Sequence, residues 1–209
     1  MSEPIKKPNQ IPESYSPTKP LIMSMVQKIT ELSPEIPAIE VYQAHREQYQ
    51  VLGIENKTPN GTVGDWGACW NVFLNSNARN IVEFLRTEKS TFLGVFCQSD
   101  TGYYNYLIGG VVSDVSETPE GMFLANFPAA DFIVVTHEWM PSIDEAEQQV
   151  GRIVGYAHGS ELQLPDGYIK YNAPPSPIMF IESYNYEFDN NRFRFEVWFP
   201  IRDKGGEIK

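Results

Sequence analysis

The stretch Arg192-Phe-Arg-Phe-Glu-Val-Trp-Phe-Pro200 alternates its side chains between two kinds. Successive side chains of a β-strand point to opposite faces of a sheet. One face here is purely apolar and suits a core: Phe193, Phe195, Val197 and Phe199. The other face combines charge with an indole: Arg192, Arg194, Glu196 and Trp198. We therefore predict a strand whose second face carries a carboxylate beside a tryptophan, as a polar-anchored aromatic groove needs. The alternative is a solvated face with an incidental glutamate.

The preceding segment, Ile178 to Phe188, forms a predicted hairpin with this strand through Asp189-Asn190-Asn191. Glu182, Tyr184 and Tyr186 share one face of it. A three-residue loop places Tyr184 opposite Glu196 and Glu182 opposite Trp198, so that all four line one groove. A two-residue loop shifts the register by one and turns the tyrosines toward the core. The sequence leaves both registers open.

The same order of elements occurs upstream of the hairpin. Asp131 to His137 is a predicted strand, and a helix runs from Ser142 to about Ala157, with Ser142 and Glu145 in the spacing of a capping box. With the hairpin, this half of the chain reads strand, helix, strand, strand.

The first half repeats this order. We predict a strand at Tyr49 to Glu55, a helical stretch from about Val63 to Thr87 that breaks near Asn75 to Asn80, and strands at Phe92 to Gln98 and Tyr103 to Asp114. Two such units indicate an internal duplication. The predicted fold class is α+β: duplicated βαββ units forming a curved antiparallel sheet, with helices on one face and a ligand groove on the other.

The N-terminal region is expected to lie outside this domain. Prolines recur through residues 1 to 20, which predicts a flexible tail. Ile22, Val26 and Ile29 then follow at helical spacing and predict a short amphipathic helix. The predicted organisation is a tail and helix at 1–46, a domain at 47–202 and a C-terminal tail at 203–209.

Composition limits the possible partners and location. The chain has 209 residues, 42% of them hydrophobic, which is enough for one sizeable core. Its formal charge of -11 repels phosphate backbones, so no nucleic-acid partner is expected. We find no apolar run that could span a bilayer and no signal sequence, so we expect a cytoplasmic protein without a membrane partner. Cys69 and Cys97 are expected to be free thiols.

Motifs for metal, nucleotide or nucleophile chemistry are not found. His45, His137 and His158 have no metal-ligand spacing, and no phosphate-binding glycine motif or nucleophile elbow occurs. Ser142 is explained as a helix cap. We therefore expect no metal and no cofactor.

Aromatic residues make up 13% of the chain, and flat side chains favour planar ligands. The candidates for a ligand-binding surface, besides Trp198 and Tyr186, are Trp66, Trp70, Tyr104, Tyr106, Phe132 and Trp139. For each of these six, core packing or a loop anchor is the alternative, and for Tyr106 it is the favoured one.

Several short motifs occur in the order found in one known family. The ending FEVWFPI, the upstream IESY, the opening YQVLGIE, the helical ACWNVF and the stretch GYYNYLIGGVVSD resemble the corresponding parts of GyrI-like small-molecule-binding domains. The resemblance covers roughly residues 47 to 202. It implies a duplicated βαββ domain with a central ligand groove, and it places the family's drug-contacting glutamate at Glu196.

The chain looks most similar to stand-alone members that hydrolyse the cyclopropane of flat DNA-alkylating natural products. The resemblance implies an aromatic cage in which Glu196 or Glu182 activates a water molecule and a tyrosine such as Tyr184 stabilises the developing oxyanion. The expected partner is a planar, apolar or weakly cationic small molecule. A non-catalytic drug binder or ligand sensor and a protein-interaction module of the gyrase-inhibitor type are the alternatives. The physiological ligand and the oligomeric state are not fixed by the sequence.

Overall fold

The computed structural model describes residues 22–29, 37–59, 65–97, 103–172 and 176–205. The strands are β1 (Ile22–Ile29), β2 (Ile39–Arg46), β3 (Tyr49–Pro59), β4 (Thr91–Cys97), β5 (Tyr103–Val112), β6 (Phe123–Phe127), β7 (Ala130–His137), β8 (Tyr168–Lys170), β9 (Ile178–Glu187) and β10 (Arg192–Asp203). The helices are α1 (Trp66–Leu74), α2 (Asn77–Leu85) and α3 (Ile143–His158), and a 3₁₀ turn, η1, spans Phe188–Asn190.

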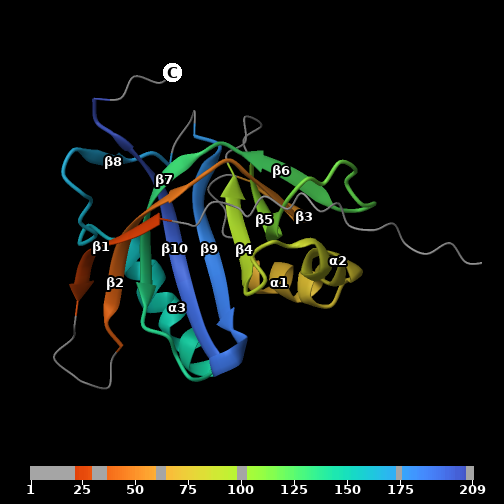
Figure 1. Ribbon diagram of the computed structural model, residues 1–209, viewed down its shortest axis with the longest axis horizontal. Helices are drawn as coiled ribbons and strands as arrows, with labels where there is room; N and C mark the ends of the chain where they lie inside the picture. The colour runs from red at the N-terminus through yellow and green to blue at the C-terminus, as the bar shows by residue number, and fades with distance from the viewer. Residues whose placement is uncertain (1–21, 30–36, 60–64, 98–102, 173–175, 206–209) are drawn as a thin grey trace, which may run out of the picture.

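All these strands belong to one antiparallel sheet (Figure 1). Its order is β1-β2-β7-β10-β9-β4-β5-β3-β6, and β8 pairs with the end of β10. The predicted fold class, α+β with a large antiparallel sheet, is confirmed. Among the described residues, no helix is long and apolar enough to cross a lipid bilayer.

The helices cover two separate parts of one sheet face. Helix α3 packs on β10 and β7, whereas α1 and α2 pack on β5 and β3. Phe180 of β9 contacts Phe96 of β4 on one side and Phe199 of β10 on the other, so the two covered parts share a face. Strands β9 and β4 lie between them in the strand order. Aromatic side chains of α1 and α3 reach over these two strands from either side, and the candidate site lies there.

The opposite face of the sheet carries its own apolar core. Its buried residues include Val51, Leu93, Val134, Ile181 and Trp198, drawn from strands along most of the sheet. Successive side chains of these strands point to opposite faces of the sheet, and apolar side chains occur on both. Both faces of the sheet therefore bury apolar surface.

Local signals in the sequence set the helix boundaries. The Ser142 hydroxyl accepts a hydrogen bond from the Glu145 amide at 3.3 Å and so caps α3, as predicted. The Asp65 carboxylate accepts one from the Ala68 amide at 2.9 Å and caps α1. The expected break in the first helical stretch is confirmed, because α1 ends at Leu74 and α2 begins at Asn77.

The predicted N-terminal helix is wrong. Ile22–Ile29 forms strand β1, which pairs with β2 from Ile22–His45 to Ile29–Ile39. A short apolar segment satisfies helical and strand spacing almost equally, and the unpaired edge of β2 supplies hydrogen-bonding partners that decide between them. Strand β2 in turn pairs with β7 along its whole length, so residues 39–46 belong to the sheet. The predicted tail at 1–20 lies outside the described residues.

The hairpin register that would have joined the two glutamates is also wrong. Glu182 pairs with Val197, and Glu196 pairs with Ser183. The connection is one residue longer than Asp189-Asn190-Asn191, since β9 ends at Glu187 and η1 begins at Phe188. This shift by one residue moves Glu182 and Tyr184 to the face opposite Glu196 and Trp198. The alternative register, in which the tyrosines turn toward the core, is therefore the one observed, since Tyr184 pairs with Phe195.

Candidate functional site

Glu182 projects from β9 on the helix-bearing face of the sheet, between side chains of α1 and α3. Phe180 and Tyr184 flank it on the same face, because they lie two residues away along the strand. Tyr106 of β5 and two tryptophans of α1 complete the surroundings. We call this cluster the Glu182 site; it consists of Trp66, Trp70, Phe96, Tyr106, Phe180, Glu182 and Tyr184.

A chain of hydrogen bonds ends on the Glu182 carboxylate. The Trp70 Nε1–H donates to the Tyr106 hydroxyl at 2.7 Å, and that hydroxyl donates to Glu182 Oε2 at 2.6 Å. The Tyr184 hydroxyl donates a second bond to the carboxylate. Hydrogen bonds to an ionised group are the stronger kind, so these contacts fix the carboxylate between two strands.

Aromatic rings surround the carboxylate. The Trp70 ring lies 4.6 Å from Tyr184, and the Trp66 ring lies 4.9 Å from Tyr106, both in edge-to-face geometry. Phe96 stacks on Phe180 with centroids 4.1 Å apart. Such rings offer large, rigid contact surfaces to a planar ligand.

The electrostatics of the site leave one acidic group without a cationic partner. Burial raises the pKa of Glu182, and the hydrogen bonds from Tyr106 and Tyr184 offset part of that rise. Burial and the neighbouring carboxylate also raise the pKa of Tyr106 and of Tyr184, so both remain phenols and hydrogen-bond donors. None of the ion pairs found among the described residues involves Glu182.

The site is accessible in part. Tyr106 is fully buried, whereas Glu182, Tyr184, Trp66 and Trp70 keep part of their surface in solvent. Helix α3 borders the site from the other side: His158 lies edge-on to Phe180, with ring centroids 5.0 Å apart.

Three other predicted residues lie together on the opposite face. Glu196 accepts a hydrogen bond from Trp198 Nε1 at 2.8 Å and pairs with Arg194 at 2.5 Å. Phe132 contacts the Trp198 ring edge-on and is fully buried. Glu196 thus has a cationic partner within the protein and is only 2% exposed.

The remaining predicted residues do not contact the Glu182 carboxylate in the structure, or their side chains lie outside the described residues. Trp139 packs against Arg192 and Arg194, at 5.4 and 4.7 Å from the ring centroid. Tyr186 stacks on Phe193 near the end of the hairpin. Tyr104 is part of β5, but its side chain lies outside the described residues.

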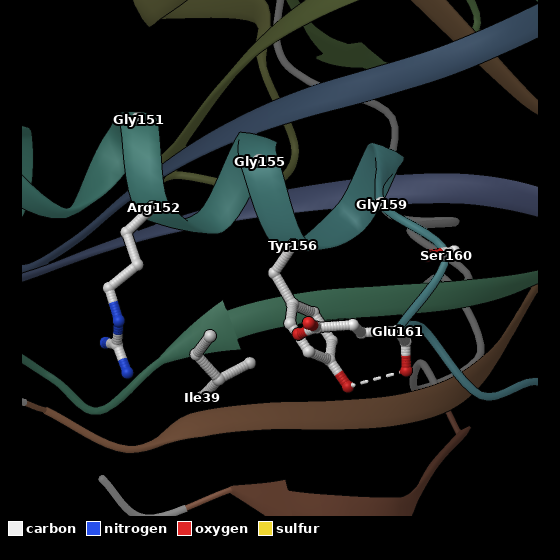
Figure 2. Close-up of a pocket in the computed structure, with 8 residues that line it drawn as sticks. All are labelled: Ile39, Gly151, Arg152, Gly155, Tyr156, Gly159, Ser160 and Glu161. Atoms are coloured by element: carbon white, nitrogen blue, oxygen red, sulfur yellow. Dashed lines mark hydrogen bonds between the residues drawn. The ribbon is translucent and has the colours of Figure 1, made fainter.

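Two surface hollows lie elsewhere on the molecule. The first, of about 390 Å³, lies between α3 and β2 and is lined by Ile39, Arg152, Tyr156 and Glu161 among others (Figure 2). The second, of about 330 Å³, is lined by His45, Asp131, Tyr171 and Arg202 among others. Arg152 already donates to the Pro37 carbonyl, and His45 pairs with Asp131. We favour the Glu182 site because it holds a largely buried carboxylate that has no cationic partner in the part of the chain that the structure describes.

Two residues of the site are not among the candidates that the sequence offers: Phe96 and Phe180 are expected only as strand residues. Tyr106 is among the candidates, with core packing as the favoured alternative. The period-two pattern of β9 already placed Phe180 beside Glu182, which was the available signal. Among the described residues, no group of three or more His, Cys, Asp or Glu side chains is placed to hold a metal ion.

Comparisons with known proteins show the family and the fold of the chain. Residues 44–201 match the family model Cass2, described as integron-associated effector binding protein. The structure of SAV2435 bound to tetraphenylphosphonium is similar in fold, with a TM-score of 0.52 and 14% identity over 78% of this chain and 94% of that one. An integron cassette protein from the mobile metagenome of Vibrio cholerae gives a TM-score of 0.48 and 12% identity over 78% and 95% of the two chains. EcmrR in a DNA complex gives 0.49 and 11% identity over 79% of this chain and 58% of that one. No match is found among curated proteins.

Proposed function

The chain belongs to the family of integron-associated effector-binding proteins, and from this premise we propose that it binds an aromatic, cationic small molecule at the Glu182 site. One observation carries the proposal: Glu182 is a largely buried carboxylate, walled by aromatic rings and held by two phenol hydroxyls, with no cation paired to it among the described residues.

Charge supports a cationic ligand. Removing a carboxylate from water without a counter-charge is unfavourable, and a ligand cation supplies that counter-charge. Positive charge delocalised over rings also interacts favourably with the faces of Trp and Tyr. The overall formal charge of -11 adds a weak, salt-sensitive attraction for cations and opposes binding to nucleic acid.

Tetraphenylphosphonium is a suitable probe, because SAV2435, a protein of similar fold, is seen bound to it. Its charge is permanent and shielded by four rings. Triphenylphosphine oxide has a similar aromatic surface without the net charge and serves as the matched neutral compound.

The test is calorimetric titration of the wild type, Glu182→Gln and Glu196→Gln with both compounds. We expect Glu182→Gln to lose about tenfold or more in affinity for the cation and to keep its weaker affinity for the neutral compound. Glu196→Gln should bind both like the wild type, since Glu196 faces away from the site. Equal cation binding by the wild type and Glu182→Gln would overturn the proposal.

The same geometry supports hydrolysis of a cyclopropane conjugated to a carbonyl as a second candidate. A carboxylate with a raised pKa is a better proton acceptor near neutral pH, and Tyr184 donates beside it. In this reaction Glu182 takes a proton from water while the water oxygen bonds to a ring carbon. The ring C–C bond breaks, its electron pair passes to the conjugated carbonyl, and the resulting oxyanion takes up a proton through Tyr184.

Mass spectrometry of a duocarmycin-class compound incubated with the protein separates the two candidates. Catalysis predicts a product heavier by one water, formed by the wild type and Glu196→Gln but not by Glu182→Gln. An unchanged compound that still binds would favour capture or sensing alone and would remove the hydrolase candidate for this substrate class.

A further inference from the structure

Gly94 lies in the middle of β4, the strand between β9, which carries Glu182, and β5, which carries Tyr106. It pairs with Glu182 on β9 and with Ile108 on β5. Tyr106 belongs to β5 and pairs with Phe96, one position further along the same face of β4. To reach Glu182, the Tyr106 side chain therefore has to cross β4 over Gly94.

The space above Gly94 is occupied by the Tyr106 phenol. A Cβ atom at position 94 would lie 2.4 Å from the Tyr106 hydroxyl oxygen and 2.9 Å from two of its ring carbons. These separations are shorter than van der Waals contact, so the ring and a Cβ atom cannot both keep their places. The φ of Gly94 is not in the left-handed region, so space, rather than backbone conformation, requires glycine here.

The Tyr106 ring has little room to retreat. It is fully buried, with Phe96 at 4.3 Å and Trp66 at 4.9 Å between ring centroids. Its hydroxyl is also held by the Trp70 indole. A displacement of Tyr106 would therefore break the bond to Glu182 and release Trp70 at the same time.

We infer that Gly94 is a specificity-determining position, at which the absent side chain lets the Tyr106 hydroxyl reach Glu182 and hold the carboxylate in position for a cationic ligand. Gly94 acts through Tyr106 and is a positioning residue. The inference rests on the proposed function of the Glu182 site.

Other glycines provide matched controls. A Cβ atom at Gly155 in α3 meets nothing within 4 Å. A Cβ atom at Gly110 in β5 meets the side chain of Val82, a residue of α2, at 2.8 Å and that of Arg86 at 3.3 Å. Gly110→Ala thus reproduces a crowded sheet glycine without touching Tyr106.

The test is a double-mutant cycle read by titration with tetraphenylphosphonium and triphenylphosphine oxide. Gly94→Ala should weaken cation binding by about tenfold and leave binding of the neutral compound within about twofold. In a Tyr106→Leu background, Gly94→Ala should alter cation affinity by less than about twofold, because the Tyr106 phenol that the new methyl group would displace is already absent. Gly155→Ala and the folded fraction of Gly110→Ala should bind the cation like the wild type.

Additive losses in the cycle, or equal losses for both compounds, would overturn the inference while leaving the proposed function intact. Absence of cation binding by the wild type would overturn the proposed function itself. If Gly94→Ala alone does not fold, addition of Tyr106→Leu should restore folding, since the smaller side chain makes room for the new methyl group. A double variant that also fails to fold would overturn the inference.

Discussion

Glu182 and Glu196 lie on adjacent strands of one hairpin but project from opposite faces of the sheet. Glu182 is directly opposite Val197, and Glu196 is directly opposite Ser183, so the two carboxylates differ by one step of the strand alternation. Their surroundings differ accordingly. Glu196 pairs with Arg194 within the protein, whereas the donors to Glu182 among the described residues are the hydroxyls of Tyr106 and Tyr184.

The Arg194–Glu196 pair is expected to stabilise the fold and not to bind ligand. Arg194→Met removes the cation paired with the buried Glu196 and leaves the longer-range attraction of Arg46, and loss of one partner of a buried pair typically costs about 3–5 kcal/mol. We expect urea unfolding to show a loss of this order, reduced because Arg194 is partly exposed. Tetraphenylphosphonium affinity of the folded protein should not change; a stable variant with weakened binding would contradict this assignment.

Trp70 is expected to support Glu182 through Tyr106. Trp70→Phe removes the indole donor to the Tyr106 hydroxyl, and a net hydrogen bond is worth about 0.5–1.5 kcal/mol. Cation affinity measured by titration should therefore fall by about 2- to 10-fold. Trp139→Phe is the control, because Trp139 packs on Arg194. A larger loss from the control than from Trp70→Phe would point to a different binding surface.

Cation binding should strengthen as pH rises. The ligand competes with a proton for Glu182, whose pKa is raised by burial, so affinity should increase above the ordinary carboxyl pKa of about 4.3 and level off once Glu182 is ionised. Tyr106 and Tyr184 stay protonated in this range. Two other titratable groups lie near, Glu147 and His158 of α3.

The permanently charged tetraphenylphosphonium isolates the titration of the protein. The Glu182→Gln variant should show a flat profile between pH 5 and 8, the same range to be measured for the wild type at about half-unit steps. A His158→Asn variant should keep the wild-type slope. A slope that persists without Glu182 would assign the titration to another group.

Glu182 is also expected to reduce stability at neutral pH. A group whose pKa is higher in the folded than in the unfolded state favours folding when protonated, and this contribution is lost as pH rises through the folded-state value. Glu182→Gln should therefore raise the Tm at neutral pH, by an amount on the order of 1 kcal/mol or about 2–4 °C. Calorimetry at acidic pH should find no such difference; a lower Tm at neutral pH would contradict the prediction.

The hairpin shows how far local sequence determined the fold. The alternation of β10 correctly placed Phe195, Val197 and Phe199 on the face that packs against α3. The register depended on the length of the connection, and the sequence did not exclude either of two shorter loops. The observed turn adds Phe188 to a 3₁₀ element and places Asn191 at a φ of 48°, a conformation that asparagine tolerates better than most residues.

The Glu182 site itself depends on contacts between distant segments. Trp70, Tyr106 and Glu182 come from α1, β5 and β9. The sequence separation between Tyr106 and Glu182 does not predict that the Tyr106 side chain crosses β4. That contact depends on the order of the strands in the sheet. Composition and strand alternation identified Glu182, Tyr184 and Trp70 as candidates. These signals did not show that Glu196 and Trp198, which were also candidates, belong to a different face of the sheet.

The most direct test of the central claim is a crystal structure of the protein with tetraphenylphosphonium. We predict that the phosphorus lies between α1 and α3 beside the Glu182 carboxylate, with phenyl rings against Trp70, Tyr184 and Phe180. A cation found on the opposite face beside Glu196 and Trp198, or in the hollow between α3 and β2, would contradict the assignment of Glu182 as the ligand anchor.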